Sequence, residues 1–402
     1  MNSLPPVNDI LCGDALAELQ KLPSNYIQCV VTSVPYYNLR DYNVEGQIGL
    51  EKTPQEYIAK LVEVFREVRR VLRSNGICWI NSGDTYAGGR RGRDDSGDGG
   101  KFGGPRIQLV DNPIPSGFKP KDLMMIPARL AIALQDDGWW LRSDIIWNKV
   151  TAMPESVADR PTSAHEHIFL LAKSERYYYD ADAIREPLKP KTFTTFGTKH
   201  RGQGNDALGL VKSDNWGRTV TERKPKLDTA GEIAGANKRN VWSIAAQPYA
   251  EAHFATMAPK VVEPCILAGT SPRACEHCGS PWQRITVKEL VPNPGGGTKR
   301  ANTPSPNTEV VPTSVFRTGM SHINHTAGWM PTCTCKDNTG LGKCIVFDPF
   351  MGAGTTAKVA LEQGRNYLGI ELNPEYIKLA KKRIETLQPT LWGSIGESEV
   401  SA

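Results

Sequence analysis

The amino-acid sequence predicts an α/β fold, with a parallel β-sheet covered by helices. The first 85 residues alternate short apolar runs with amphipathic stretches, in the order strand, helix, strand, helix, strand. Residues 344–387 repeat this alternation as strand, helix, strand, helix. Neighbouring parallel strands are joined by a long crossover that is usually a helix. Both segments therefore indicate a parallel sheet.

The elements of the first segment follow from apolar spacing and from helix-capping residues. Thr53 can cap the helix that starts at Pro54, and proline suits the first helical position. The expected elements are a strand at 10–11, a helix at 14–22, a strand at 27–32, a helix at 54–72 and a strand at 76–81.

The middle of the chain mixes regular elements with irregular stretches. A helix is expected at 122–135, and strands are expected at 139–147 and 167–171. Glycine and proline dominate residues 87–121, so we expect a flexible loop there, or a loop that orders only on binding. Residues 271–342 form a second irregular insert.

The last segment contains the clearest strand-to-helix turn of the chain. A strand is expected at 344–347, followed by the sequence DPFMGAGTT and a helix at 355–363. A second strand at 365–371 leads to a helix at 374–387, which Asn373 can cap.

The chemistry of this turn suits a nucleoside-bearing ligand. Gly352 and Gly354 allow a ligand to approach the backbone, and the helix start offers unpaired N–H groups. Glu371 ends the next strand, where nucleotide-binding sheets hold ribose hydroxyls. The turn lacks the GxGxxG pattern and a Walker lysine, which favours a ligand without phosphates, such as S-adenosylmethionine. An ordinary tight turn is the alternative.

Length and composition set broad limits on the kind of protein. With 402 residues, the chain can form one large decorated domain or two to three smaller ones. Its net charge of +5 permits a nucleic-acid partner without demanding one. No stretch approaches the about 18 uninterrupted apolar residues of a membrane helix, and the first residues do not resemble a secretory signal. We therefore expect a cytoplasmic protein without a membrane partner.

Four segments form a recognisable set. They are CGDAL at 12–16, TSVPY at 32–36, HFAT through EPCI at 253–266, and DPFMGAGTT with GIELNPEY at 348–376. In this order they resemble the segment before the catalytic motif, the catalytic TSPPY motif, the helix that completes the cofactor pocket, and the cofactor motifs of amino-group DNA methyltransferases. A catalytic motif that precedes the cofactor motif is the order of the β class of this family.

The resemblance implies a Rossmann-like fold with a mostly parallel, seven-stranded sheet and helices on both faces. It also implies S-adenosyl-L-methionine as the methyl donor, in the cytoplasm of a bacterial cell or a phage-infected host. By matched position, Glu371 would hold the ribose and Asp14 would lie near the adenine. The residues that would line the rest of the cofactor site are Asp348, Pro349, Phe350, Gly352, Gly354 and Thr355.

The resemblance further implies a catalytic loop made of Ser33, Val34, Pro35 and Tyr36. An exocyclic amine conjugated to a base ring is a weak nucleophile, so the base must leave the stack and align with the methyl group. The Ser33 hydroxyl and the Val34 carbonyl are the expected acceptors for the two amine hydrogens. Tyr36 offers a ring face on which the flipped base can stack.

Val34 departs from the family pattern, which usually has proline there. Proline fixes φ and lacks an N–H. Valine leaves φ free and keeps its N–H, so we expect a loosened loop. A catalytically weak DNA-binding protein is one alternative that this departure motivates.

The target of methylation is cytosine N4 or adenine N6. Serine at the first motif position, here Ser33, is commoner in the cytosine-N4 enzymes of the family, and Asp or Asn is commoner in the adenine-N6 enzymes. Cytosine N4 is therefore favoured, with adenine N6 as the alternative. An RNA base or a protein glutamine is a further class of acceptor.

The nine cysteines fit poorly with a disulfide framework, because their number is odd. Cys275 and Cys278 form a CxxC knuckle, and Cys333 and Cys335 form a CxC pair further along the chain. Two thiolate pairs in one insert predict a tetrahedral, structural Zn²⁺ site that holds the ends of a long loop together. Cys265 lies in an apolar context and is expected to be buried.

The stretch 189–240 carries eleven Lys and Arg against five Asp and Glu, with Phe193, Phe196 and Trp216 among them. Basic residues suit DNA phosphates, and aromatic rings suit unstacked bases. We therefore expect a target-recognition region at 186–240 and double-stranded DNA as the partner.

Together these expectations divide the chain into parts. Residues 1–185 form the catalytic half of the methyltransferase domain, and residues 241–270 and 343–390 form its cofactor half. The zinc-knuckle insert occupies 271–342, and a tail occupies 391–402. A cognate restriction endonuclease is a candidate partner, and the protein is expected to be a monomer or a homodimer.

Overall fold

A computed structural model describes residues 7–41, 44–88, 90–99, 105–111, 113–186, 237–247, 257–292 and 320–387. The chain divides into two compact units. The first comprises Met1–Ile184, Arg239–Gln283 and Met330–Ala402, and the second comprises Arg185–Lys238 and Arg284–Trp329. Within the described ranges, every helix is too short or too polar to span a membrane.

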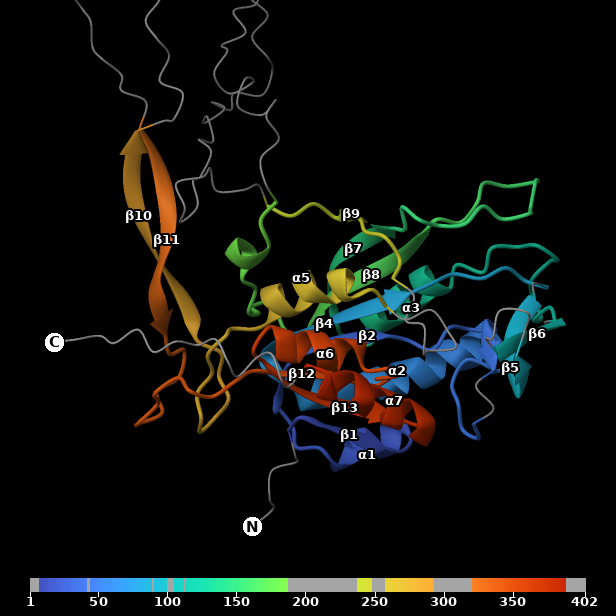
Figure 1. Cartoon of the computed structure of the whole chain (residues 1–402), viewed down its shortest axis with the longest axis horizontal. Helices are drawn as coiled ribbons and strands as arrows, with labels where there is room; N and C mark the ends of the chain where they lie inside the picture. Colours follow the sequence, from blue (N-terminus) through green and yellow to red (C-terminus); the bar gives the residue numbers. More distant parts are fainter. Residues whose placement is uncertain are drawn as a thin grey trace, which may run out of the picture. The chain divides into compact units, whose positions relative to one another are not determined.

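An eight-stranded sheet forms the centre of the first unit (Figure 1). Its strand order is β1 (Asp9–Cys12), β13 (Asn366–Glu371), β12 (Ile345–Asp348), β2 (Ile27–Ser33), β4 (Leu72–Ser82), β8 (His165–Ala172), β7 (Trp140–Asn148) and β9 (Val241–Ser243). Among these described strands only β8 runs against its neighbours, which confirms a mostly parallel sheet. The sheet has one strand more than the expected seven, because the short edge strand β9 pairs with β7.

Three helices cover one face of the sheet. They are α1 (Ala15–Lys21), α2 (Pro54–Val71) and α3 (Ile126–Asp136), and their apolar side chains share one core with the sheet. The side chains of Leu61, Phe65 and Leu130 in this core are fully buried. Thr53 caps α2 in a capping box with Glu56, which satisfies exposed N–H groups and confirms the predicted start.

Three further helices cover the opposite face. They are α5 (Pro259–Gly269), α6 (Thr355–Glu362) and α7 (Pro374–Glu385), and their buried residues form a second core with the sheet. Asn373 caps α7 as predicted. Cys265 is buried on α5, as its apolar context indicated.

The chain reverses its direction of winding between two neighbouring strands. From β2 it passes through α2 to β4, and from β12 it passes through α6 to β13 on the other side of the sheet. Since β2 and β12 are adjacent and parallel, the two crossovers leave this pair in opposite directions. Open α/β sheets bind ligands beyond the carboxyl ends of the strands at such a point.

Two smaller sheets accompany the central one. One contains β10 (Gln283–Pro292) and β11 (Met320–Met330), and the other contains β3 (Arg40–Asp41), β5 (Arg90–Gly99) and β6 (Pro105–Asp111). The structure therefore differs from the expectation of a flexible loop at 87–121, since β5 and β6 pair as antiparallel strands within it. The Gly- and Asp-rich sequence of β5 shows no alternation of apolar and polar residues that could have revealed this strand.

Several sequence expectations lie outside the described residues. Most of the expected target-recognition region, with Phe193, Phe196 and Trp216, belongs to this group. So do the centre of the zinc-knuckle insert and the tail at 391–402.

Candidate active site

A cavity of about 200 Å³ lies beyond the carboxyl ends of β1, β2, β12 and β13. It brings together the two motif regions that the chain separates by more than three hundred positions. The predicted site residues that line it are Asp14, Ser33, Val34, Pro35, Tyr36, Asp348, Pro349, Phe350, Gly352, Thr355 and Glu371. Gly354 is the one predicted site residue outside this lining, apart from the four cysteines.

Asp348 ends β12 and organises the turn that follows it. Its carboxylate accepts hydrogen bonds from the hydroxyl of Thr32 at 2.6 Å, the hydroxyl of Thr356 at 2.8 Å and the backbone N–H of Phe350 at 3.0 Å. The side chain is 3% exposed, and burial raises the pKa of Asp348 to about 6. Both carboxylate oxygens are therefore occupied by the protein, and Asp348 fixes the shape of the turn and ties β12 to β2.

The two glycines of the turn have different surroundings. Both adopt left-handed backbone angles, with φ of +52° at Gly352 and +76° at Gly354. A Cβ at Gly352 would meet only the carbonyl oxygen of Phe350, at 4.0 Å, so the backbone there faces open space. A Cβ at Gly354 would lie 2.8 Å from the Cβ of Ala380 on α7. Gly354 thus serves the packing of two helices, and Gly352 leaves room for a ligand.

Glu371 stands at the end of β13, opposite the glycine turn. One carboxylate oxygen accepts the N–H of Gly352 at 2.7 Å, and the other accepts the N–H of Asn373 at 2.8 Å. Burial raises the pKa of Glu371. Each carboxylate oxygen has a second lone pair, so this fixed side chain can still accept a hydroxyl from a ligand.

Asp14 reaches the cavity from the start of α1. Its Oδ1 accepts the N–H of Ala17 at 2.9 Å and so caps the helix. The backbone N–H of Gly13 donates to the carbonyl oxygen of Glu371 at 3.1 Å, which fixes the end of β1 beside the end of β13. Three carboxylates, those of Asp14, Asp348 and Glu371, therefore line one cavity.

The catalytic loop leaves the end of β2 and is held by backbone hydrogen bonds. The N–H of Val34 donates to the carbonyl oxygen of Asn81 at 3.2 Å, and the hydroxyl of Tyr57 donates to the carbonyl oxygen of Pro35 at 2.7 Å. Val34 is 2% exposed. Valine supplies an N–H that proline lacks, and that N–H is used here, which counts against the expectation of a loosened loop.

Residues outside the motifs hold Tyr36. Its hydroxyl donates to Oε2 of Glu166 at 2.6 Å and accepts the Nδ2 hydrogen of Asn81 at 2.9 Å. A Cβ at Gly83 would lie 2.8 Å from the ring, so Gly83 makes room for it. Sequence analysis missed these residues, although Asn81 ends a predicted buried strand, where a polar residue signals a site.

Comparison with known proteins decides the family. A family model described as DNA methylase, for enzymes that methylate N6 or N4, matches residues 27–275 and 337–382. The chain belongs to this DNA methylase family. The predicted resemblance is thereby confirmed, with S-adenosylmethionine as the methyl donor.

Two curated relatives of this DNA methylase extend over nearly the whole chain. The type II methyltransferase M.XycI of Xanthomonas campestris pv. cyanopsidis is 37% identical and covers 93% of this chain and 86% of its own. The type II methyltransferase M.SmaI of Serratia marcescens is 37% identical and covers 93% and 90%. Among solved structures, the PvuII DNA methyltransferase (cytosine-N4-specific) has a TM-score of 0.50 at 14% identity, covering 94% and 87%. This likeness shows that the fold is shared.

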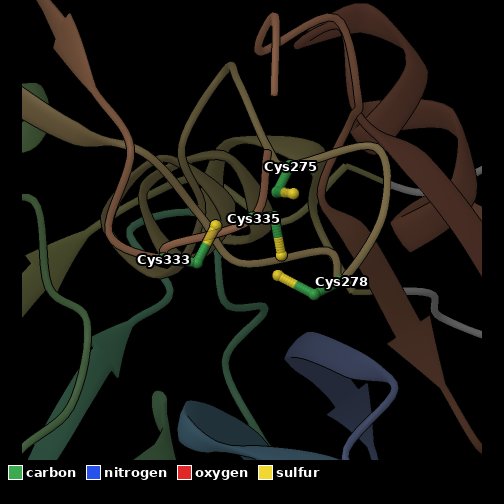
Figure 2. Close-up of side chains that lie close together, drawn as sticks. All are labelled: Cys275, Cys278, Cys333 and Cys335. Carbon is green, nitrogen blue, oxygen red and sulfur yellow. The ribbon is translucent and has the colours of Figure 1, made fainter. Parts of the chain in front are cut away.

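The DNA methylase also contains a cluster of four cysteines (Figure 2). The sulfur atoms of Cys275, Cys278, Cys333 and Cys335 all lie within 4.8 Å of one another, which is compatible with a tetrahedral zinc site. The prediction that these two thiolate pairs come together is confirmed. Four thiolates fill the coordination shell, so such a zinc would be structural.

The cysteine cluster lies at the edge of the sheet opposite the cavity. Gln28, near the amino end of β2, donates to the carbonyl oxygen of Gly279 at 2.8 Å. Arg73, near the amino end of β4, donates to the hydroxyl of Ser280 at 2.9 Å and to the carbonyl oxygen of Cys278. The amino ends of parallel strands share one edge, so the cluster is remote from the catalytic loop.

Proposed function

We propose that this DNA methylase is a site-specific type II enzyme that transfers a methyl group from S-adenosylmethionine to N4 of a cytosine rotated out of duplex DNA. The observation that carries the proposal is the meeting of the catalytic loop and the glycine turn at one cavity. The named relatives that cover the chain are type II methyltransferases, which supports site-specific action.

The residues of the cavity suit an amine acceptor. The Ser33 hydroxyl and the Val34 carbonyl can each accept one amine hydrogen, which directs the nitrogen lone pair toward the incoming methyl group. The Tyr36 ring provides a surface for the base, because its hydroxyl is already bonded to the protein. When bound, the cofactor supplies an electrophilic methyl group on a sulfonium, which carboxylate-lined walls favour.

Cytosine N4 is preferred over adenine N6 for two reasons. Ser33 places a neutral hydroxyl at the motif position where adenine-N6 enzymes more often have Asp or Asn. The solved PvuII enzyme, which shares the fold, carries the description cytosine-N4-specific. Methylation of adenine N6 is the alternative, and an RNA or protein acceptor is the next.

A catalytically weak DNA-binding protein is a further alternative. It rests on Val34, and the hydrogen bond from the Val34 N–H to the backbone carbonyl oxygen of Asn81 counts against it. We further propose that residues 186–240 read the target sequence and that a cognate restriction endonuclease acts at the same site. Type II relatives favour the second point.

The deciding experiment is single-molecule sequencing of DNA from cells that express the protein, scored for N4-methylcytosine and N6-methyladenine. We expect N4-methylcytosine in one recurring context, and none in cells that express Ser33→Ala. N6-methyladenine in a recurring context would establish the alternative. An unmodified genome, together with measurable binding of S-adenosylmethionine, would overturn the DNA assignment and direct the search to RNA and protein acceptors.

A further inference from the structure

A partly buried ion pair lies behind the catalytic loop and takes no part in the chemistry above. Glu166 is 9% exposed, and one of its carboxylate oxygens pairs with the ammonium of Lys149. The ammonium also lies 4.9 Å from the ring centre of Trp147. The Lys149 side chain is 24% exposed, and an ion pair that is only partly removed from water contributes little net stability, so its position beside the catalytic loop points to another role.

The second carboxylate oxygen of Glu166 is directed at the loop. It accepts the hydroxyl of Tyr36 at 2.6 Å and the Nδ2 hydrogen of Asn81 at 2.8 Å. Glu166 and Lys149 stand at the edge of the sheet where the cavity lies, since β8 begins there and β7 ends there. The ion pair thus contacts the catalytic loop from β8 and from the end of β7, and neither strand carries a family motif.

Asn81 connects this ion pair to three residues of the catalytic loop. Its side-chain Nδ2 lies 3.5 Å from the Ser33 hydroxyl and 2.9 Å from the Tyr36 hydroxyl, and its backbone carbonyl oxygen accepts the Val34 N–H at 3.2 Å. Asn81 is 2% exposed and stands opposite Ser33 in the pairing of β2 with β4. A shift of this one side chain would therefore move Ser33 and Tyr36 together.

The geometry excludes a proton relay from the substrate to Glu166 through this network. The group between Ser33 and Glu166 is the amide nitrogen of Asn81, which donates hydrogen bonds and does not carry a proton onward at neutral pH. The Tyr36 hydroxyl already donates to the carboxylate. Glu166 is therefore suited to hold groups in place, and unsuited to act as the base.

We propose that Glu166, neutralised by Lys149, is a positioning residue that fixes the Tyr36 ring and the Asn81 amide, and through them the catalytic loop. The proposal rests on the methyltransferase function given above. The negative charge matters because hydrogen bonds to an ionised acceptor are about twice as strong as neutral ones. Reacting groups displaced by about 1 Å can lose about a hundredfold in rate.

Glu166→Gln tests the role of the charge, because glutamine keeps the shape and removes the charge. We expect kcat to fall by about tenfold to a hundredfold, with the Kd for S-adenosylmethionine unchanged. The matched control is Asp144→Asn on neighbouring strand β7, whose carboxylate pairs with His167 and is half exposed. We expect the control to keep wild-type kcat.

A double-mutant cycle with Tyr36→Phe separates positioning from general stability. Phenylalanine keeps the ring and removes the hydroxyl that Glu166 holds. If Glu166 acts through that hydroxyl, the fall in kcat caused by Glu166→Gln is smaller in the Tyr36→Phe background. Independent losses in the two variants would contradict the proposal.

Hydrogen exchange of the backbone gives a readout that does not depend on activity. By mass spectrometry, peptides covering 33–37 should exchange faster in Glu166→Gln and in Tyr36→Phe than in the wild type or in Asp144→Asn. Unchanged exchange in both variants would overturn the positioning role even if DNA methylation were confirmed. Faster exchange in a protein that does not methylate DNA would leave the positioning role standing and reject the proposed function alone.

Discussion

The hydroxyl of Thr32 donates a 2.6 Å hydrogen bond to the buried carboxylate of Asp348, joining residues 316 positions apart. Thr32 directly precedes the catalytic loop, and Asp348 begins the glycine turn. The two lie on adjacent strands, β2 and β12, where the winding of the sheet reverses. This bond therefore adds a side-chain contact to the pairing of the two strands, at the point where the catalytic loop and the glycine turn begin.

Replacing Thr32 with valine should destabilise the fold and weaken cofactor binding. The buried carboxylate would lose one donor, which costs about 1–3 kcal/mol of unfolding free energy. Urea unfolding measures this loss, and calorimetric titration with S-adenosylmethionine measures the Kd. Thr32→Ser keeps the hydroxyl and should keep most of both quantities. A Thr32→Val variant that matches the wild type in both quantities would show that the bond contributes little.

Asp348 predicts a particular pH dependence of stability. Burial raises the pKa of Asp348 in the folded protein to about 6 from its usual value of 3.8, so the folded protein holds this proton more tightly than the unfolded chain. Its contribution to stability is then fully present below pH about 4 and is lost as the pH rises through about 6. We expect the wild type to lose up to about 3 kcal/mol relative to Asp348→Asn across this window. A difference that does not vary with pH would contradict the shift.

Gly352 and Gly354 form a matched pair for testing the turn. Alanine at either position carries about 1–2 kcal/mol of left-handed backbone strain. Gly354→Ala also clashes with Ala380 and should lower the melting temperature further. Gly352→Ala has open space beside it and should mainly raise the Kd for the cofactor. Thermal melts and titrations of both variants would show the opposite ranking if the assignments were reversed.

Val34→Pro should lower activity, although proline restores the usual family motif. Proline removes the N–H that Asn81 accepts and leaves a buried carbonyl without its donor. The lost bond corresponds to about 1–2 kcal/mol, or about a tenfold fall in kcat if it acts in the transition state. Val34→Ala keeps the N–H and serves as the control. A gain in kcat for Val34→Pro would support the hypothesis that valine loosens the loop.

Zinc should stabilise the fold without touching the cofactor site. We expect about one equivalent of zinc by elemental analysis, and a lower melting temperature in Cys278→Ser or after chelation. The Kd for S-adenosylmethionine should stay unchanged, because the cluster lies at the opposite edge of the sheet from the cavity. Protein purified without chelator and free of zinc would contradict the site.

The sequence predicts the cofactor side of the site well because its signals are local. The turn after Asp348 and the acid at Glu371 follow from strand ends, glycines and caps within one short stretch. Gly354 shows the limit of such a motif, since its contact partner Ala380 lies on another helix and only the packed structure reveals it. The motif alone could not distinguish Gly352, which has open space beside it, from Gly354, which packs closely against α7.

The support of the catalytic loop could not be predicted from the sequence. Glu166 reaches Tyr36 across 130 positions of sequence, on the one antiparallel strand of the central sheet described here. Its place depends on the register between β4 and β8, which short apolar runs do not encode. The contact that Val34 makes could not be predicted for a related reason, because the acceptor of its N–H belongs to the neighbouring strand.

The four-cysteine cluster has a consequence for how this chain can change over evolutionary time. Gln28 and Arg73 hold residues 278–280 at the amino-terminal edge of the sheet, and the grouping of the four cysteines brings Cys333 and Cys335 to the same place. A loop whose ends are already fixed can gain or lose residues at little further entropic cost to the domain. The segment between Cys278 and Cys333 can therefore change in length between related enzymes, while the residues of the cavity at the carboxyl-terminal edge of the sheet stay the same.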